Sequence, residues 1–462
     1  MQVVGRIAFR MLVVADFGGH AARGEIRPGR DLRPFRVDLD NLLQVVRKIA
    51  PSVPISVGRE APFTVAIEDL EDFHPDHLYS HLDFFSPMRE LRRQLHDPKA
   101  FARAAALLGK ASEPASSTAA VPADDADLAR LLGRPSSTAP SAAGVAATVD
   151  NLIRQAVAPH IVGKSDPRQA ALVTAVDGMT GELMRAVLHD PGFQGVEAVW
   201  RGLDRLLRTL ELDESLQVFV LDASSAELAA DFASVPDLGD SAMYRILVGH
   251  TQETPWSLLV NGNPCSRRQE DISLLARLGT LAQAVDAAVV AGMDWQAWAN
   301  GAPSLEELRA CSALRCSATA HAIAVAVPSF LLRLPYGKGT EPIEKFVFTE
   351  QSTPPVPGGY LWGSGAFAVA ESLARSYAAA GGWDFSPGDV SVVTDLPVYV
   401  FTQDGESVET PVAQAWLPEA KIDELIKDGL VPLVSVRGRG ELRLPRVQSL
   451  ASPPASLAGR WR

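Results

Sequence analysis

Residues 63–82 gather many of the side chains that could perform chemistry in this chain. The segment reads FTVAIEDLEDFHPDHLYSHL and combines carboxylates with three histidines and a proline. His77 and His81 would lie four residues apart on one helix face, a spacing that can hold a metal ion. Neighbouring carboxylates could also act as an acid–base pair, and the candidates are Glu68, Asp69, Glu71 and Asp72.

The same segment also fits a purely structural interpretation. Val65 and Ile67 alternate with polar neighbours, as in a half-buried strand, and Pro75 suits the first turn of a following helix. Acidic residues at such a junction cap the helix N-terminus. No Cys-rich or H-E-x-x-H pattern supplies further metal ligands. We therefore favour capping acids and solvated histidines, and we expect neither a metal nor a cofactor.

Other signatures of chemistry in the sequence are incomplete. The Gly-Lys-Gly of YGKGTEP lacks P-loop spacing, and Ser364 in LWGSGAF lacks the G-x-S-x-G spacing of a nucleophile elbow. Asp222 and Asp395 end apparent strands, where catalytic residues occur in α/β folds, but strand termination explains both. The three cysteines match neither a disulfide framework nor a zinc pattern. The sequence therefore predicts no enzyme.

Composition narrows the class of protein further. The chain has 462 residues, 47% of them hydrophobic, and a net charge of -12. This charge argues against nucleic acid as a partner, because phosphate binding needs an excess of Lys and Arg. No apolar run is long enough for a membrane span, and the N-terminus reads as a strand and turn rather than a signal peptide. With so few cysteines, a reducing cytoplasm is the expected location.

A shift in composition divides the chain into blocks. Ala, Ser, Thr and Pro dominate residues 111–148, which we expect to be a disordered linker. The linker separates a block at 1–110 from a second block at 149–450, and a tail at 451–462 is also expected to be disordered.

Both blocks mix predicted strands with predicted helices. MLVVAD at 11–16 predicts a buried strand, and Leu39, Leu42 and Val46 predict one face of a helix. After the linker, two long helices precede strands predicted at 217–224, 244–250, 256–262 and 286–293. The predicted fold class is mixed α/β, in two blocks joined by the linker.

Three stretches of the first block read FRMLVVADFGG (9–19), FRVDLDNLLQVVRKIAPSVPISV (35–57) and VAIEDLEDFHPDHLYSHLDFFSPMRELRRQL (65–95). Together they resemble the small subunit of the contractile sheath of bacterial type VI secretion systems. The second block resembles the large sheath subunit, with its strongest stretches at 188–207, 267–292, 330–348, 359–383 and 425–438. The two subunits are normally separate chains, and the large subunit normally continues for a further region.

The resemblance implies a structural protein without catalytic residues. Its expected partners are further sheath protomers by self-association, together with inner tube and baseplate proteins. The alternative is a non-polymerising adaptor, baseplate-associated part or assembly regulator of the same machine. The residues expected to matter for the core or for interfaces are Phe73, Pro75, Trp200, Arg201, Arg333, Pro335, Tyr336 and Trp362.

One segment inside the linker, PADDADLARLLG at 122–133, predicts a short amphipathic helix. Leu128, Leu131 and Leu132 form one apolar stripe on it. The resemblance implies a partner for this stripe, a Clp-type AAA+ ATPase that grips a similar helix of the large subunit. Docking of the helix on its own protein remains the alternative.

Overall fold

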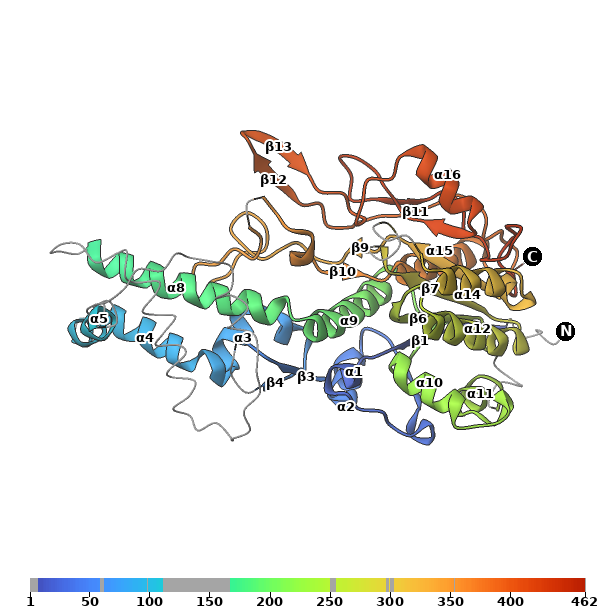
Figure 1. The fold of residues 1–462 in the computed structure, drawn as a ribbon, viewed down its shortest axis with the longest axis horizontal. Helices are drawn as coiled ribbons and strands as arrows, with labels where there is room; N and C mark the ends of the chain where they lie inside the picture. The colour runs from blue at the N-terminus through green and yellow to red at the C-terminus, as the bar shows by residue number, and fades with distance from the viewer. Residues whose placement is uncertain are drawn as a thin grey trace.

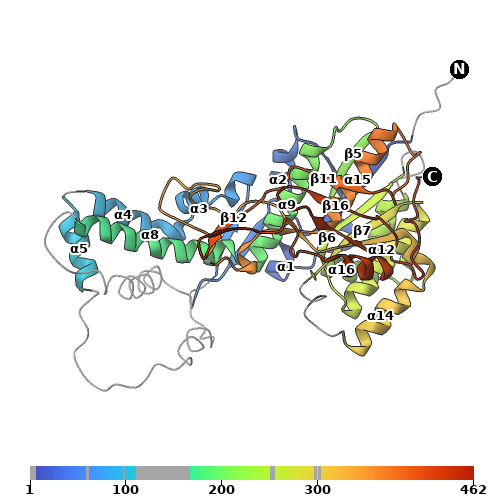
Figure 2. The same cartoon turned by 90° about the horizontal axis from the view of Figure 1, so that it is seen from above.

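The computed structural model describes residues 7–58, 62–97, 99–110, 167–249, 255–295, 299, 303–352 and 354–461. The predicted linker at 111–148, with its helix at 122–133, lies outside these residues. Figures 1 and 2 show a sheet-containing body with a helical arm that extends from it. Within the described ranges, no helix combines the length and the apolar character that a membrane span needs.

A single sheet of seven strands forms the centre of the body. Its strand order is β14-β8-β7-β6-β1-β5-β2. The strands are β1 (Phe9–Ala15), β2 (Pro34–Val37), β5 (Leu216–Asp222), β6 (Leu258–Cys265), β7 (Ala288–Met293), β8 (Ile323–Val327) and β14 (Leu430–Pro432). All neighbours run parallel except the edge strand β2. Covered parallel strands read as continuous apolar runs, as MLVVA and IAVAV do.

The first block does not build a sheet core of its own. Its strand β1 lies between β5 and β6 of the second block, with Phe9 opposite Leu216 and Met11 opposite Leu258. Every β1 residue except Arg10 is buried. The mixed α/β fold class and the packing of the first block against the second are therefore confirmed.

Helices cover both faces of the sheet. On one face, α9 (Pro191–Thr209) and α15 (Gly365–Ala380) share a core with the side chains of Phe9, Met11 and Val13. On the other face, Leu12 and Val14 share a core with α10 (Ser225–Ala233), α12 (Gln269–Ala284) and α14 (Leu305–Arg315). Successive β1 side chains alternate between the two cores, as strand geometry requires.

The arm joins helices from both blocks. α4 (Ser86–His96) and α5 (Phe101–Lys110) lie beside α8 (Pro167–Leu188) in both views. Arg92 donates from Nε to Oδ1 of the buried Asp177 at 2.7 Å, and this contact fixes α4 against α8. Between arm and body lie α1 (His20–Arg23), α2 (Leu42–Ile49), α3 (Pro75–His81) and the hairpin of β3 (Ser52–Ile55) and β4 (Phe63–Ala66).

The C-terminal part adds smaller elements over the body. They are the pair β9 (Phe330–Leu331) and β10 (Trp362–Gly363), the three-stranded sheet of β11 (Ser391–Val393), β15 (Val434–Ser435) and β16 (Leu442–Leu444), and the hairpin of β12 (Val400–Gln403) and β13 (Glu406–Glu409). α16 (Glu419–Lys427) precedes β14.

The expectation of a disordered tail after Leu450 is wrong for the described residues 451–461. Leu457 and Trp461 are buried, and the Trp461 ring packs against Phe385. The amide of Ala458 donates to the carbonyl oxygen of His321 at 2.7 Å. Two apolar side chains four residues apart thus anchor a segment whose composition resembles that of a loop.

Two local expectations also fail. The strand predicted at 244–250 is a helical turn, α11 (Ala242–Tyr244) followed by a π-type turn at 245–249. The Ser241 hydroxyl caps it, and short apolar runs do not distinguish a strand from a buried helix. Leu39 is exposed, because the helix begins only at Leu42.

Candidate functional site

Asp69, Asp72 and His74 of residues 63–82 act as helix caps. The Asp69 carboxylate accepts a hydrogen bond from the Glu71 amide, and Asp72 accepts from the amides of Glu68 and Asp69. His77 lies 2.9 Å from Asp72 through Nδ1 and stacks on the exposed His81. Among the described residues, no set of three possible ligand atoms that lie within 4.8 Å of one another includes this histidine pair.

Residues 63–82 also contact the second block. The Asp76 carboxylate accepts hydrogen bonds from the amides of Glu344 and Lys345 at 2.9 and 3.0 Å. The His74 ring meets the edge of Tyr336 at 5.0 Å between centroids. The start of α3 thus holds the loop that follows the LLRLPYG stretch, although the two are more than 250 residues apart in sequence.

Aromatic side chains continue this contact towards the sheet. Phe73 is fully buried and lies edge-on to Phe193 at 5.4 Å. The Trp200 indole donates to the carbonyl oxygen of Phe17 at 3.0 Å, and its ring meets the Phe17 ring at 4.9 Å. Phe193 and Trp200 belong to α9 and the other two residues belong to the first block. We call these contacts, with those of His74 and Asp76, the block junction.

The glycine pair after β1 allows the close approach at the block junction. Gly19 has φ +76°, and a Cβ there would lie 2.8 Å from the Ser52 carbonyl oxygen and 3.2 Å from Val196 Cγ2. A Cβ on Gly18 would lie 2.3 Å from the His20 ring. Only glycine combines this left-handed conformation with so little space, which explains the Gly-Gly of FRMLVVADFGG.

A buried ion network underlies the block junction. Arg333 donates to Glu197 through Nε at 2.8 Å and to Glu350 through Nη1 at 2.7 Å and Nη2 at 3.0 Å. Arg201 also reaches Glu197, at 2.7 Å, and donates to the Tyr336 hydroxyl at 3.0 Å. Glu197, Glu350 and Arg333 are all at least 95% buried. We call these five side chains the Arg333 network.

The electrostatics of the Arg333 network are those of a structural site. Burial alone would raise the pKa of Glu350, but the Arg333 guanidinium outweighs it and holds this pKa at about 2. Burial likewise acts to lower the pKa of Arg333, and the two carboxylates raise it well above its usual value. The Glu197 and Glu350 carboxylates each face a guanidinium, so the buried charges of the network are paired.

The sequence-predicted site residues converge here with one exception. Phe73, Trp200, Arg201, Arg333 and Tyr336 lie in the block junction or the Arg333 network, and Pro75 and Pro335 are buried beside them. Trp362 lies apart in β10, half-buried, with its indole donating to the Pro357 carbonyl oxygen. Sequence reasoning missed Glu197 and Glu350, since isolated glutamates carry no spacing signal.

A second ionic cluster joins the carboxyl ends of β1 and β5. One possible ligand atom each from Asp16, His20 and Asp222 lies within 4.8 Å of the others. However, Arg27 Nη1 and His20 Nε2 each lie 2.9 Å from Asp222 Oδ2. The Asp16 oxygens accept from the amides of His20 and Ala21. Because its acceptors already face donors, the cluster ties the first block to β5 rather than forming an ion cage.

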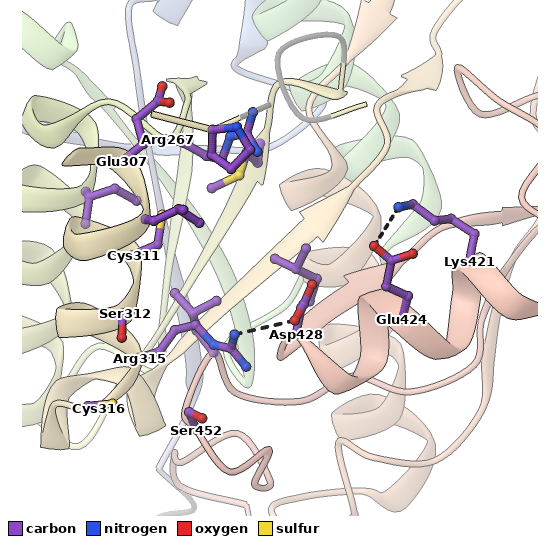
Figure 3. A pocket seen from close by; sticks show the side chains of 16 residues that line it. Arg267, Glu307, Cys311, Ser312, Arg315, Cys316, Lys421, Glu424, Asp428 and Ser452 are labelled. Atoms are coloured by element: carbon purple, nitrogen blue, oxygen red, sulfur yellow. Dashed lines mark hydrogen bonds and ion pairs between the residues drawn. The ribbon is translucent and has the colours of Figure 1, made fainter. Parts of the chain in front are cut away.

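A cavity of about 460 Å³ lies between α14 and α16 (Figure 3). Two ion pairs lie along it, Arg315 with Asp428 at 3.6 Å and Lys421 with Glu424 at 2.7 Å. Burial raises the pKa of the lining Cys311 thiol, which disfavours the reactive thiolate. This lining does not form a nucleophile and base pair.

Comparison with known proteins agrees with this structural character. Residues 170–451 match the VipB (EvpB) tail sheath N-terminal domain, and residues 2–110 match the type VI secretion system VipA family. The chain is 27% identical over 306 residues to the type VI secretion system sheath protein TssC1 of Pseudomonas aeruginosa strain PAO1. That match covers 61% of this chain and 61% of the relative, so the chain spans about three fifths of the length of the curated relative.

The VipA match lies ahead of the VipB match in the chain. The VipA match ends at residue 110, and the VipB match begins at residue 170 and runs through β16. Both are families of sheath components and not of enzymes. Because the VipB match covers more than half of this chain, the chain belongs to the tail sheath family of type VI secretion systems, with a VipA-like segment fused ahead of the sheath domain.

Proposed function

We propose that this chain is a structural protomer of a type VI contractile sheath, with the small and large subunits fused into one polypeptide. The observation that carries the proposal is the place of β1 between β5 and β6. Separate subunits would have to complete this sheet by association. A tether converts that step into an intramolecular one with a high effective concentration.

In this proposal, residues 1–110 and 149–450 remain the two functional segments. The block junction and the Arg333 network hold them together within one protomer, which gives Phe73, Pro75, Trp200, Arg201, Arg333, Pro335 and Tyr336 a role inside the protomer. Trp362, half-buried in β10, remains a candidate for contact with a neighbouring protomer. Polymerisation would then use surfaces outside the block junction.

Electron microscopy of the purified full chain in negative stain tests the proposal. Tubes or rings of uniform width are the expected result. Particles that remain single protomers at all concentrations would instead support the second candidate, a non-polymerising adaptor or assembly regulator of the same machine.

The partners of such a protomer follow from the same proposal. They are other sheath protomers, the inner tube and the baseplate, in the cytoplasm. Leu128, Leu131 and Leu132 lie outside the described residues, and we retain them as a proposed docking helix for a Clp-type AAA+ ATPase. Changing Leu131 and Leu132 to Asp should abolish binding of the ATPase N-terminal domain without lowering Tm. A drop in Tm would place the helix in the fold instead.

A further inference from the structure

An arginine-lined groove crosses the edge of the sheet near α11. It encloses about 670 Å³. Its charged and aromatic lining residues are Arg10, Arg30, Arg33, Arg245, Phe219 and Trp256. The Arg10 guanidinium lies over the rings of Phe219 and Trp256, at 4.6 and 4.2 Å from their centroids. Aromatic rings and guanidinium groups together form the floor of this groove.

The groove is positive in a chain that is negative overall. Four arginines and no acidic residue line it, whereas the whole chain carries a net charge of -12. Arg30, Arg33 and Arg245 are exposed. Burial lowers the pKa of Arg10, and the charge of Arg36 lowers it further. A cluster of like charges around aromatic rings favours an anionic, peptide-sized partner.

The β12–β13 hairpin has the opposite character. Its strands pair from Val400 with Glu409 to Gln403 with Glu406. Asp404 and Gly405 have φ +53° and +85°, the left-handed conformations of the tight turn that Asp-Gly favours. All residues from 402 to 407 are exposed, and residues 399–412 contain three acids and no Lys or Arg.

The base of this hairpin is anchored while its tip is exposed. Tyr399 meets the ring of Tyr360 at 5.8 Å, and the Tyr360 hydroxyl lies 3.2 Å from the Thr410 hydroxyl. The Gly438 amide donates to the Glu409 carboxylate. The hairpin therefore presents Asp404 and Glu406 in a defined conformation, which reduces the entropy lost on binding.

The hairpin and the groove lie on opposite sides of the molecule. In Figure 1, β12 and β13 project at the top of the molecule, while α11, which contributes Ala242 to the groove, lies at the bottom right. One copy therefore cannot fill its own groove with its own hairpin. Two such surfaces on opposite sides form a head-to-tail contact, which generates rings or open filaments rather than a closed dimer.

We propose that the acidic β12–β13 hairpin of one copy docks into the arginine-lined groove of a second copy. Asp404 and Glu406 face Arg30 and Arg33 in this contact. The inference rests on the proposed sheath function and names one of the surfaces through which copies associate. Its specificity comes from charge, because a like charge placed across the contact is strongly unfavourable.

Charge reversal on each surface tests the docking. The hairpin variant combines Asp404→Asn, which tolerates the left-handed conformation, with Glu406→Lys. The groove variant combines Arg30→Glu and Arg33→Glu, both at exposed positions. Sedimentation velocity on the full chain should show self-association weakened by about tenfold or more in each variant. A chain that carries all four substitutions should recover part of the lost self-association.

A mixing experiment isolates this contact from any other. The hairpin variant keeps an intact groove and the groove variant keeps an intact hairpin. Mixed together, they should form a 1:1 complex that does not grow further. The control variants Glu306→Lys and Arg309→Glu change exposed charges on α14 and should assemble as the wild type does. Melting curves confirm folding, and Arg30→Ala with Arg33→Ala replaces the groove variant if it fails to fold.

The outcomes separate this inference from the sheath proposal. If the wild type assembles and all charge reversals assemble equally well, the docking is overturned and the sheath proposal stands. If the wild type remains a monomer, both fail.

Discussion

Replacing Arg333 by Met should destabilise the protein more than any single surface substitution. Arg333 makes close contacts with two carboxylates that are both at least 98% buried, Glu197 at 2.8 Å and Glu350 at 2.7 Å. Arg201 can still neutralise Glu197, but Glu350 loses its only guanidinium partner among the described residues. An uncompensated buried charge of this kind costs about 3–5 kcal/mol.

The magnitude can be checked against matched variants. Arg208→Met removes the pair with Asp204 on the same helix, in which the Arg208 side chain is 65% exposed, and should cost less than about 1 kcal/mol. Arg333→Met combined with Glu350→Gln removes the orphaned charge and should recover part of the loss. The free energy of unfolding from urea titration, followed by circular dichroism, gives all three values. Equal costs for Arg333→Met and Arg208→Met would refute the reasoning.

The same network predicts an acid-dependent loss of stability. The pKa of Glu350 is about 2 in the folded protein, against a usual value of 4.5. Because the folded pKa is depressed, the stabilisation is fully present above about pH 4.5 and is lost as the pH falls towards 2. A difference of this size corresponds to about 3 kcal/mol. Glu350→Gln should flatten this part of the stability–pH curve, and an unchanged curve would assign the acid sensitivity to other groups.

Three further predictions concern the joining of the blocks and the side chains singled out first. Protease cleavage between residues 111 and 166 should leave the two fragments together on gel filtration, because β1 of the first block pairs with β5 and β6 of the second. Separation of the fragments without denaturant would contradict the shared sheet. His77→Ala with His81→Ala should change neither metal content nor stability, and stoichiometric zinc that is lost in this double variant would revive a metal site. Phe73→Asp should destabilise the protein by several kcal/mol because it buries a charge, and Phe73→Leu is the milder control. Cys316 should react with a thiol reagent in the native protein and Cys265 should not. Cys265 is buried, and burial raises the pKa of its thiol to about 12. Rapid labelling of Cys265 would show that the face covered by α12 and α14 opens.

Local patterns in the sequence determined much of the secondary structure. Continuous apolar runs such as MLVVA and AVVAGM predicted buried strands, because parallel strands covered on both faces have few polar positions. Pro75 and the acids before it predicted a helix start, because capping acts within a few residues. The same local reasoning failed at 244–250, because a short apolar run fits both a strand and a buried helical turn. It also failed at the tail, where Arg460 donates to the distant carbonyl oxygen of Val285.

Tertiary structure alone decided which strands are neighbours and which charges are partners. The apolar pattern of β1 contains no information that it lies between β5 and β6, because strand pairing depends on the packing of the whole sheet. The partners of Arg333 are 136 and 17 residues away, and isolated glutamates have no distinguishing pattern in a sequence. Periodicity and capping are short-range properties of a chain, whereas a buried ion pair is stable only where the fold excludes water from both partners.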